Sequence, residues 1–281
     1  MLAHDAPLAG IRVLSLAINV PGPVAAARLR DLGATVTKVE PPGGDFLAFA
    51  ARAWYDDMCR GQHVVSMNLK DAAQRVALDV MLHDADILIL SSRPSALARL
   101  QLSPDAVLAR YPSLCVISIV GHMPPRHEEA GHDLTYQCDA GLIDATMPPT
   151  LVADMAAAEE AVNAALVLLL RRARTGHGGV TTVSLADAAA RMALPRTHGL
   201  TRPGGILGGG LSTYALYDTA DGVLALAALE SHFAERLALL LGIAAPAHES
   251  LAAIFATRRA AEWAEWGRTN DIPMMAVEAA S

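Results

Sequence analysis

Two kinds of apolar pattern alternate along the first 194 residues. Short runs rich in leucine and β-branched residues predict buried strands at residues 11–17, 35–40, 86–90, 114–120 and 180–185. Longer stretches predict helices at residues 24–32, 71–84, 103–110, 154–175 and 186–194. Strands and helices that alternate in this way form β-α-β units with right-handed crossovers. The pattern therefore predicts an open, mostly parallel α/β sheet with helices on both faces.

Proline and glycine mark where these elements begin and end. The run Pro21-Gly22-Pro23 breaks the first strand, so the first helix is expected to start at Val24. Gly33 follows that helix and is expected to be its C-cap. The longest helix is expected to stop at the glycine-containing segment 176–179.

The pattern changes after residue 194. Residues 195–210 contain two prolines and six glycines without apolar periodicity, which predicts a linker or a mobile loop. Apolar runs at 213–217 and 223–228 flank an Asp-Gly turn and predict a β-hairpin. Further helices are expected at 232–242, 250–255 and 258–266. We therefore predict a large, Rossmann-like α/β domain at 1–194, a linker at 195–210 and a smaller α+β domain at 211–281.

Composition and charge exclude several classes of protein. The chain is 53% hydrophobic and only 18% charged, which excludes intrinsic disorder, and its net charge of −7 gives no general affinity for nucleic acid. The longest apolar run, 164–170, stops at two arginines and is too short to cross a bilayer. Residues 1–7 lack the basic and apolar regions of a signal peptide, and the three cysteines form neither a disulfide framework nor a metal pair. A cytoplasmic protein without a metal is expected.

The turn after the first strand argues against dinucleotide binding. Asn19-Val20-Pro21-Gly22-Pro23 stands where such folds have a glycine-rich loop, and proline lacks the N–H groups that bind pyrophosphate. Glu40 ends the second strand, where a ribose-binding acid would lie. Without the glycines, nicotinamide and flavin are not the expected ligands.

Three polar residues are candidates for chemistry, and each has a plainer alternative. His132, in Gly131-His132-Asp133, suits a general base, although the residue alone favours an ordinary loop histidine. Asp154 begins the longest predicted helix, where an aspartate is more often a cap than a nucleophile. Glu230 ends an apolar strand and would face either solvent or a cleft.

Taken in order, short segments of the chain resemble the family III CoA-transferases, which include formyl-CoA transferase, carnitine CoA-transferase and α-methylacyl-CoA racemase. The matching segments are 7–14, 21–23, 31–45, 85–88, 93–94, 131–133, 152–154, 174–178, 217–222 and 263–266. They run in family order over nearly the whole chain, and the ordered set is highly specific.

The resemblance implies a fold and an assembly. Family members have a large α/β domain and a small domain, and two chains interlock as a homodimer. They usually continue beyond the point, near Glu278-Ala279, where this chain stops. The resemblance therefore implies either a differently closed dimer or a C-terminally shortened variant.

The resemblance also implies chemistry at Asp154, which matches the family's catalytic aspartate. In the transferases this carboxylate attacks an acyl thioester to give a mixed anhydride, and CoA ends on a different carboxylic acid. In the racemases Asp154 and His132 would face each other across Cα of a 2-methylacyl-CoA and exchange its proton. The Gly-His-Asp segment and the strand ending at Glu230 look more like the racemase branch.

Coenzyme A would thus be a substrate, with no tightly bound cofactor. We expect Val20, Arg60, Ser92 and Arg93 to bind it. The leading prediction is a CoA-transferase, and the racemase is a close alternative.

The chain also departs from the family pattern. Residues 155–158 replace the glycines that follow the catalytic aspartate, and residues 59–63 lose two basic positions that would meet CoA phosphates. These losses motivate a third hypothesis, in which the protein binds CoA or a partner subunit without turnover.

Overall fold

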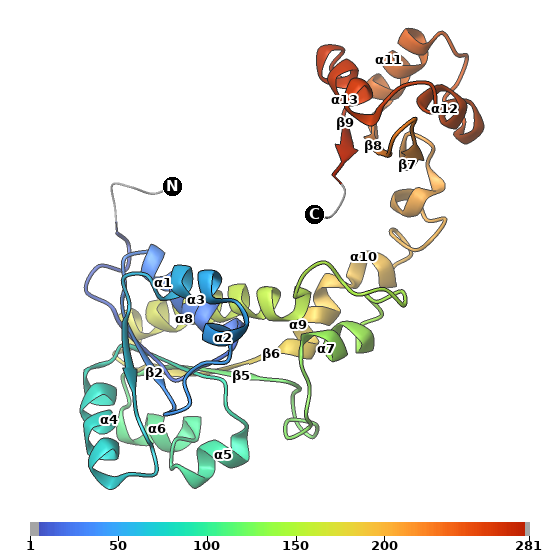
Figure 1. The fold of residues 1–281 in the computed structure, drawn as a ribbon. Coiled ribbons are helices and arrows are strands. Elements are labelled where there is room, and N and C mark those ends of the chain that lie inside the picture. The colour runs from blue at the N-terminus through green and yellow to red at the C-terminus, as the bar shows by residue number, and fades with distance from the viewer. Residues whose placement is uncertain (1–5, 279–281) are drawn as a thin grey trace. The chain divides into compact units, whose positions relative to one another are not determined.

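The computed structural model describes residues 6–278, which form two compact units (Figure 1). The first unit extends to Ala193 and the second begins at Leu194. The expected absence of a signal peptide at 1–7 rests mainly on residues outside this described range. The expected chain end near Glu278-Ala279 also falls partly outside it.

A parallel sheet of six strands forms the centre of the first unit. The strands are β1 (Arg12–Ser15), β2 (Thr35–Glu40), β3 (His63–Ser66), β4 (Ile87–Leu90), β5 (Cys115–Val120) and β6 (Gly179–Ser184). Their order is β3-β2-β1-β4-β5-β6, and every neighbouring pair is parallel. The predicted Rossmann-like sheet is confirmed. After β3 the chain crosses to the other side of β1, which makes the gap between β1 and β4 a topological switch point.

Helices cover both faces of this sheet, as predicted (Figure 1). They are α1 (Pro21–Asp31), α2 (Leu47–Ala50), α3 (Arg52–Cys59), α4 (Ala72–Asp84), α5 (Pro94–Arg99), α6 (Pro104–Arg110), α7 (Asp133–Asp139), α8 (Val152–Thr175) and α9 (Leu185–Met192). α1, α3 and α8 lie on one face, whereas α4, α5 and α6 lie on the other. A hydrophobic cluster fills each side, and the buried alanines of α1 and α8 let these two helices pack closely.

The first helix begins earlier than predicted. α1 starts at Pro21 instead of Val24, because proline at the first helical position loses only an N–H that would be unpaired there. Gly22 is needed for space, since a Cβ at this position would lie 2.1 Å from the Cβ of Ala17. The turn therefore presses the start of α1 against the end of β1 and fixes the loop between them.

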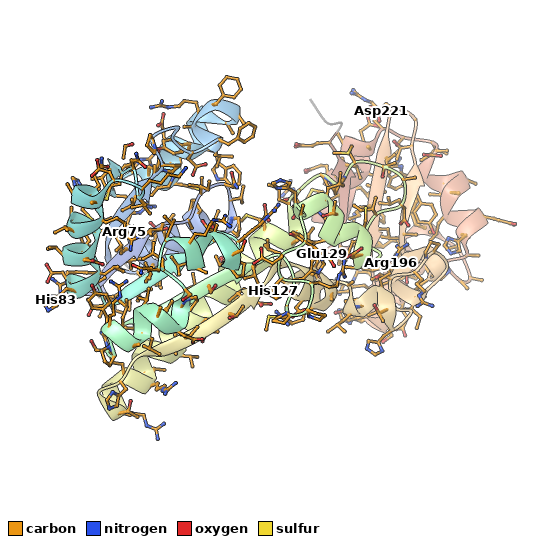
Figure 2. All side chains as sticks on the ribbon, turned by 90° about the horizontal axis from the view of Figure 1, so that it is seen from below. Arg75, His83, His127, Glu129, Arg196 and Asp221 are labelled. Carbon is orange, nitrogen blue, oxygen red and sulfur yellow. The ribbon has the colours of Figure 1, made fainter. Side chains whose placement is uncertain are left out.

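The second unit is a small antiparallel sheet with helices. Its strands are β7 (Tyr214–Asp218), β8 (Val223–Ala227) and β9 (Met274–Val277), and its helices are α10 (Leu194–Thr197), α11 (Ser231–Leu241), α12 (His248–Phe255) and α13 (Ala260–Thr269). The predicted hairpin is confirmed by the pairing of β7 with β8. In the hairpin loop, the Asp221 carboxylate accepts the Ala260 N–H at 2.8 Å and pairs with Arg259 at 2.7 Å (Figure 2).

The segment predicted as a linker is folded in part. It contains most of α10 and a wide helical turn, η1 (Ile206–Gly210), whose Gly209 has a φ of +86°. Backbone bonds such as Gly204 N–H to the Gly208 carbonyl, at 3.0 Å, close the loop on itself. Glycine therefore marks tight local turns here.

No helix within residues 6–278 is long and apolar enough to cross a membrane.

Candidate active site

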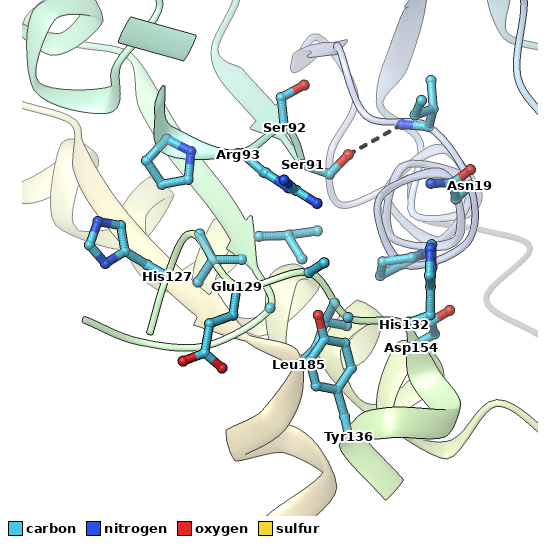
Figure 3. A pocket seen from close by; sticks show the side chains of 18 residues that line it. Asn19, Ser91, Ser92, Arg93, His127, Glu129, His132, Tyr136, Asp154 and Leu185 are labelled. Carbon is cyan, nitrogen blue, oxygen red and sulfur yellow. Dashed lines mark hydrogen bonds between the residues drawn. The ribbon is translucent and has the colours of Figure 1, made fainter. Parts of the chain in front are cut away.

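A cavity of about 270 Å³ lies at the carboxyl ends of β1, β4, β5 and β6 (Figure 3). The residues that line it include Ile18 and Asn19 after β1, the segment 91–94 after β4, Gly121 after β5 and Leu185 after β6. Open α/β sheets bind ligands at this edge, beside the switch point, because the loops there diverge. The cavity is therefore the candidate active site of the first unit.

Asp154 lines this cavity from the first turn of α8. The helix begins at Val152, so the expected capping role of Asp154 is wrong. The buried Asp133 carboxylate takes that role instead, because its Oδ1 accepts the backbone N–H of Asp154 at 3.0 Å. Gln137 donates to the other oxygen of Asp133 at 2.5 Å and to the carbonyl of Thr150 at 3.1 Å. This network holds the start of α8 against α7.

The environment of Asp154 changes its acidity. Burial raises the pKa of Asp154 to about 7, and the negative charge of Asp133 adds to the effect. The carboxylate and the carboxylic acid are therefore both populated near neutral pH. Such a group can exchange a proton with a substrate, and its ionised form can attack a carbonyl carbon.

His132 lines the same cavity and lies directly before α7. Its backbone N–H donates to Thr135 Oγ1 at 3.1 Å, and that hydroxyl donates back to the His132 carbonyl at 2.8 Å. This closed turn fixes the backbone, while the imidazole has no hydrogen-bond partner within the described range. The structure thus brings His132 and Asp154 to one cavity.

The third predicted catalytic residue, Glu230, belongs to the second unit. It is exposed and directly precedes α11. The strand β8 ends at Ala227, so Glu230 does not end a strand as expected. It is not among the residues that line the cavity of the first unit.

Two of the four residues predicted to bind CoA line the cavity. Ser92 and Arg93 follow β4 and belong to its lining, and the Arg93 side chain points into it (Figure 3). Val20 is buried directly before α1 and lines neither this cavity nor the second cavity described below. Arg60 follows α3, where its side chain is exposed and pairs with Asp57.

A second cavity of about 500 Å³ adjoins the first one. The two share Ile18 and Ser92. Its walls are mainly apolar, with Val39 and Met67 among them, and Lys70 stands on its lining. Lys70 was not expected to have a role, although its place just after β3 puts it at the ligand-binding edge of the sheet.

A buried cluster of charges supports the wall of the first cavity. Lys38 is 1% exposed, and its Nζ lies 2.7 Å from Glu40 Oε1 and 2.7 Å from Asp45 Oδ2. The other Asp45 oxygen accepts the N–H groups of Asn19 and Leu47, each at 3.0 Å. Asn19 has a φ of +70°, in the left-handed region that is unfavourable for most residues. The cluster therefore fixes the backbone of a residue that lines the cavity.

The loop between β5 and α7 forms the opposite wall and carries His127 and Glu129 (Figure 2). Glu128 ties this loop to the start of α5, because its carboxylate accepts the Ser95 N–H at 2.7 Å and the Ser95 hydroxyl at 2.9 Å. Within residues 6–278, no three or more His, Cys, Asp or Glu side chains are grouped so that they could hold a metal ion.

Comparisons with known proteins support the resemblance. A protein named "Probable fatty acyl-CoA transferase Rv3272" from Mycobacterium tuberculosis is 31% identical over 65% of this chain and 51% of its own length. Alpha-methylacyl-CoA racemase from Mus musculus is 30% identical over 92% of this chain and 74% of its own length. The chain thus spans about half of one relative and about three quarters of the other.

A solved structure and a family model cover nearly the whole chain. The crystal structure of a CAIB/BAIF family protein from Brucella suis matches with a TM-score of 0.82 at 22% identity, over 98% of this chain and 85% of that one. At this identity the match shows the fold alone. The model of CoA-transferase family III matches residues 8–281. The chain therefore belongs to CoA-transferase family III.

Proposed function

We propose that this chain is a CoA-transferase that moves CoA between two carboxylic acids through an anhydride at Asp154. The observation that carries the proposal is the half-buried Asp154 carboxylate, which lines a cavity at the switch point while Asp133 holds its backbone. The family membership and the relative named as a probable fatty acyl-CoA transferase support the same reaction class.

The proposed reaction needs no net proton transfer. An Asp154 oxygen attacks the carbonyl carbon of the acyl-CoA, the C–S bond breaks and CoA leaves as a thiolate. The thiolate attacks the aspartyl carbonyl carbon of the anhydride, and the first acid leaves as a carboxylate. The second carboxylate attacks this aspartyl thioester and releases CoA thiolate again. The thiolate then takes the second acyl group, and the Asp154 carboxylate is restored.

The two adjoining cavities suit a long ligand such as an acyl-CoA. We place the thioester in the first cavity, beside Asp154 and Arg93. The apolar walls of the second cavity suit the adenine ring, and Lys70 supplies a positive charge for a phosphate. Arg60, which is exposed, is retained as a proposed contact for an outer phosphate.

Chemical trapping tests the anhydride directly. The purified protein is mixed with acyl-CoA and then with hydroxylamine or borohydride, and the modified peptide is located by mass spectrometry. We expect modification at Asp154 alone. Asp154→Asn should lower turnover by about a thousandfold or more, because an amide is not a nucleophile. Asp105→Asn, in the exposed first turn of α6, is the matched control and should not change turnover. Full turnover by Asp154→Asn would overturn the proposal.

One observation favours the racemase as a second candidate. His132, whose imidazole is unpartnered, and Asp154, whose pKa is raised to about 7, line the same cavity. A 2-methylacyl-CoA incubated in deuterated water should then gain deuterium at Cα, and His132→Ala should abolish the exchange. In this alternative Glu230 is a proposed third catalytic residue, tested by Glu230→Gln. Exchange without CoA transfer would replace the leading proposal.

The remaining hypothesis is binding without turnover. It would be retained if wild type and Asp154→Asn bind CoA equally and neither turns over any acyl-CoA. We also propose, from the family resemblance, that the chain works as a homodimer in the cytoplasm. Sedimentation that gives only monomer at micromolar concentration would count against the dimer.

A further inference from the structure

Tyr136 lies on the face of α7 that carries the site. It is one helical turn after His132 and Asp133, and residues three and four apart share a helix face. His132 lines the cavity and Asp133 holds the backbone of Asp154. The whole residue is 2% exposed, and it too lines the cavity. The start of α7 and the residue directly before it thus serve the site with three side chains.

The ring of Tyr136 is fixed by its packing. It shares a hydrophobic cluster with Ala153 of α8 and Ala189 of α9. The His122 ring meets it edge-on, with centroids 5.2 Å apart and an interplanar angle of 77°. These contacts come from different parts of the chain and leave the phenol little freedom to turn.

Two glycines make room for the phenolic oxygen. A Cβ at Gly121 would lie 2.3 Å from Tyr136 Oη, and a Cβ at Gly131 would lie 2.5 Å from it. No side chain therefore fits at either position unless Tyr136 moves. Both glycines also line the cavity, so the hydroxyl lies beside two lining residues that have no side chain.

The hydroxyl has no hydrogen-bond partner among residues 6–278. It points into the cavity (Figure 3). A phenol at a cavity wall can donate its hydrogen bond to a ligand that enters. Burial raises the pKa of Tyr136, the negative charge of Asp154 raises it further, and Arg93 opposes both. The phenol is therefore neutral and keeps its proton for donation.

We infer that Tyr136 is a further catalytic residue, whose hydroxyl donates a hydrogen bond to the carbonyl oxygen of the acyl-CoA thioester. The inference rests on the proposed function. In the transferase the thioester oxygen becomes negative when Asp154 attacks, and in the racemase it becomes negative when Cα loses its proton. A donor that is already fixed stabilises that charge at no cost of reorganisation. The phenol keeps its proton throughout.

Tyr136→Phe tests the inference because it removes one oxygen and keeps the ring packing. We expect kcat to fall about 100-fold while KM changes little, as for the loss of one oxyanion donor. Tyr111→Phe is the matched control, since the Tyr111 hydroxyl contacts Asp79 and lies before β5, at the opposite end of that strand. It should leave kcat unchanged. Circular dichroism checks that both variants are folded.

Two CoA analogues separate a contact with the carbonyl from a general effect on the fold. A ketone analogue, with CH2 in place of sulfur, keeps the carbonyl oxygen, whereas an S-alkyl-CoA thioether lacks it. Tyr136→Phe should weaken binding of the ketone and leave binding of the thioether unchanged. Equal binding of the ketone by both proteins, or full kcat in Tyr136→Phe, overturns the inference while the transferase stands. A wild type that neither binds the ketone nor turns over acyl-CoA overturns both.

Discussion

Two buried groups of charges lie near the carboxyl edge of the sheet, and they differ in how they are paired. Around Lys38, two carboxylates share one ammonium group. The other Asp45 oxygen accepts two backbone N–H groups, and the Glu40 oxygen that meets Lys38 also accepts the Tyr55 hydroxyl. At Asp154 no cation from residues 6–278 is in contact, and a second carboxylate, Asp133, lies against its backbone.

The difference distinguishes a structural group from the group that we propose is reactive. A buried ion pair that is held by further hydrogen bonds is inert and fixes geometry. A half-buried carboxylate without a counter-ion has a raised pKa, and groups of that kind are frequent in active sites. The Lys38 cluster therefore supports the cavity, and Asp154 is the group that we propose reacts in it. Substitutions in each cluster test this contrast.

The largest effect is expected from Lys38→Met. Removing the ammonium leaves Glu40 and Asp45 buried side by side without a cation, which should cost about 3–5 kcal/mol of unfolding free energy. Urea denaturation at pH 7 measures the loss. Lys70→Met, at an exposed lysine, should change stability by less than about 0.5 kcal/mol. Adding Asp45→Asn to Lys38→Met should recover part of the lost stability. If none is recovered, repulsion between the Glu40 and Asp45 carboxylates is not the cause of the loss.

The unpaired state of Asp154 predicts a pH-dependent stability. Its pKa is about 7 in the folded protein and about 3.9 when unfolded, so between these values the folded state binds more protons. Stability should therefore fall as the pH rises from about 4 to 7, and Asp154→Asn should lack this decrease. We expect Asp154→Asn to gain on the order of 4 kcal/mol over wild type between pH 4 and pH 8. Urea denaturation at several pH values measures this decrease. If the unfolding free energy falls equally with pH in both proteins, the Asp154 carboxylate is not destabilised in the fold.

The contrast between the clusters also bears on what a sequence can predict. The strand and helix patterns located the parallel sheet, because burial imposes a period on the residues themselves. The starts of the helices were harder to predict from the sequence. α1 begins at Pro21 because proline fits the first helical position, and α8 begins at Val152 with Asp133, far away in sequence, accepting an N–H of its first turn. That cap depends on tertiary contact and leaves no local signal.

The site shows the same limit. His132 and Asp154 were both identified, but as separate residues, because only the contact of α7 with α8 brings them to one cavity. α7 was not predicted, so the spacing from His132 to Tyr136 could not be recognised as one helix face. The edge strands β3 and β9 were missed too, since they are short and β3 is mostly exposed.

Asp133→Asn brings Asp154 closer to the Lys38 cluster, because it removes a like charge beside the carboxylate. Its effect should be smaller than those of Lys38→Met and Asp154→Asn. It removes the negative charge while Oδ1 can still accept the Asp154 N–H. The pKa of Asp154 should fall but stay above its ordinary value, because burial is the larger cause of its rise. The rise of transferase rate with pH should therefore shift to lower pH. An unshifted profile would mean that the Asp133 charge does not act on Asp154. Loss of an acceptor for Gln137 should cost about 1 kcal/mol.

The smallest effect is expected from Glu128→Gln, in the loop opposite the Lys38 cluster. Hydrogen bonds from Ser95 hold the pKa of Glu128 below its usual range, so this carboxylate is ionised at every pH at which Asp154 titrates. A glutamine keeps one oxygen for the Ser95 N–H, and the site is exposed, where such contacts contribute little. We expect KM for acyl-CoA to change by roughly twofold or less and the pH profile to stay unshifted. Rates measured between pH 5 and pH 9 test both points. A shifted pH profile would show that Glu128 titrates together with Asp154. The loop between β5 and α7 would then belong with the unpaired carboxylates of the site.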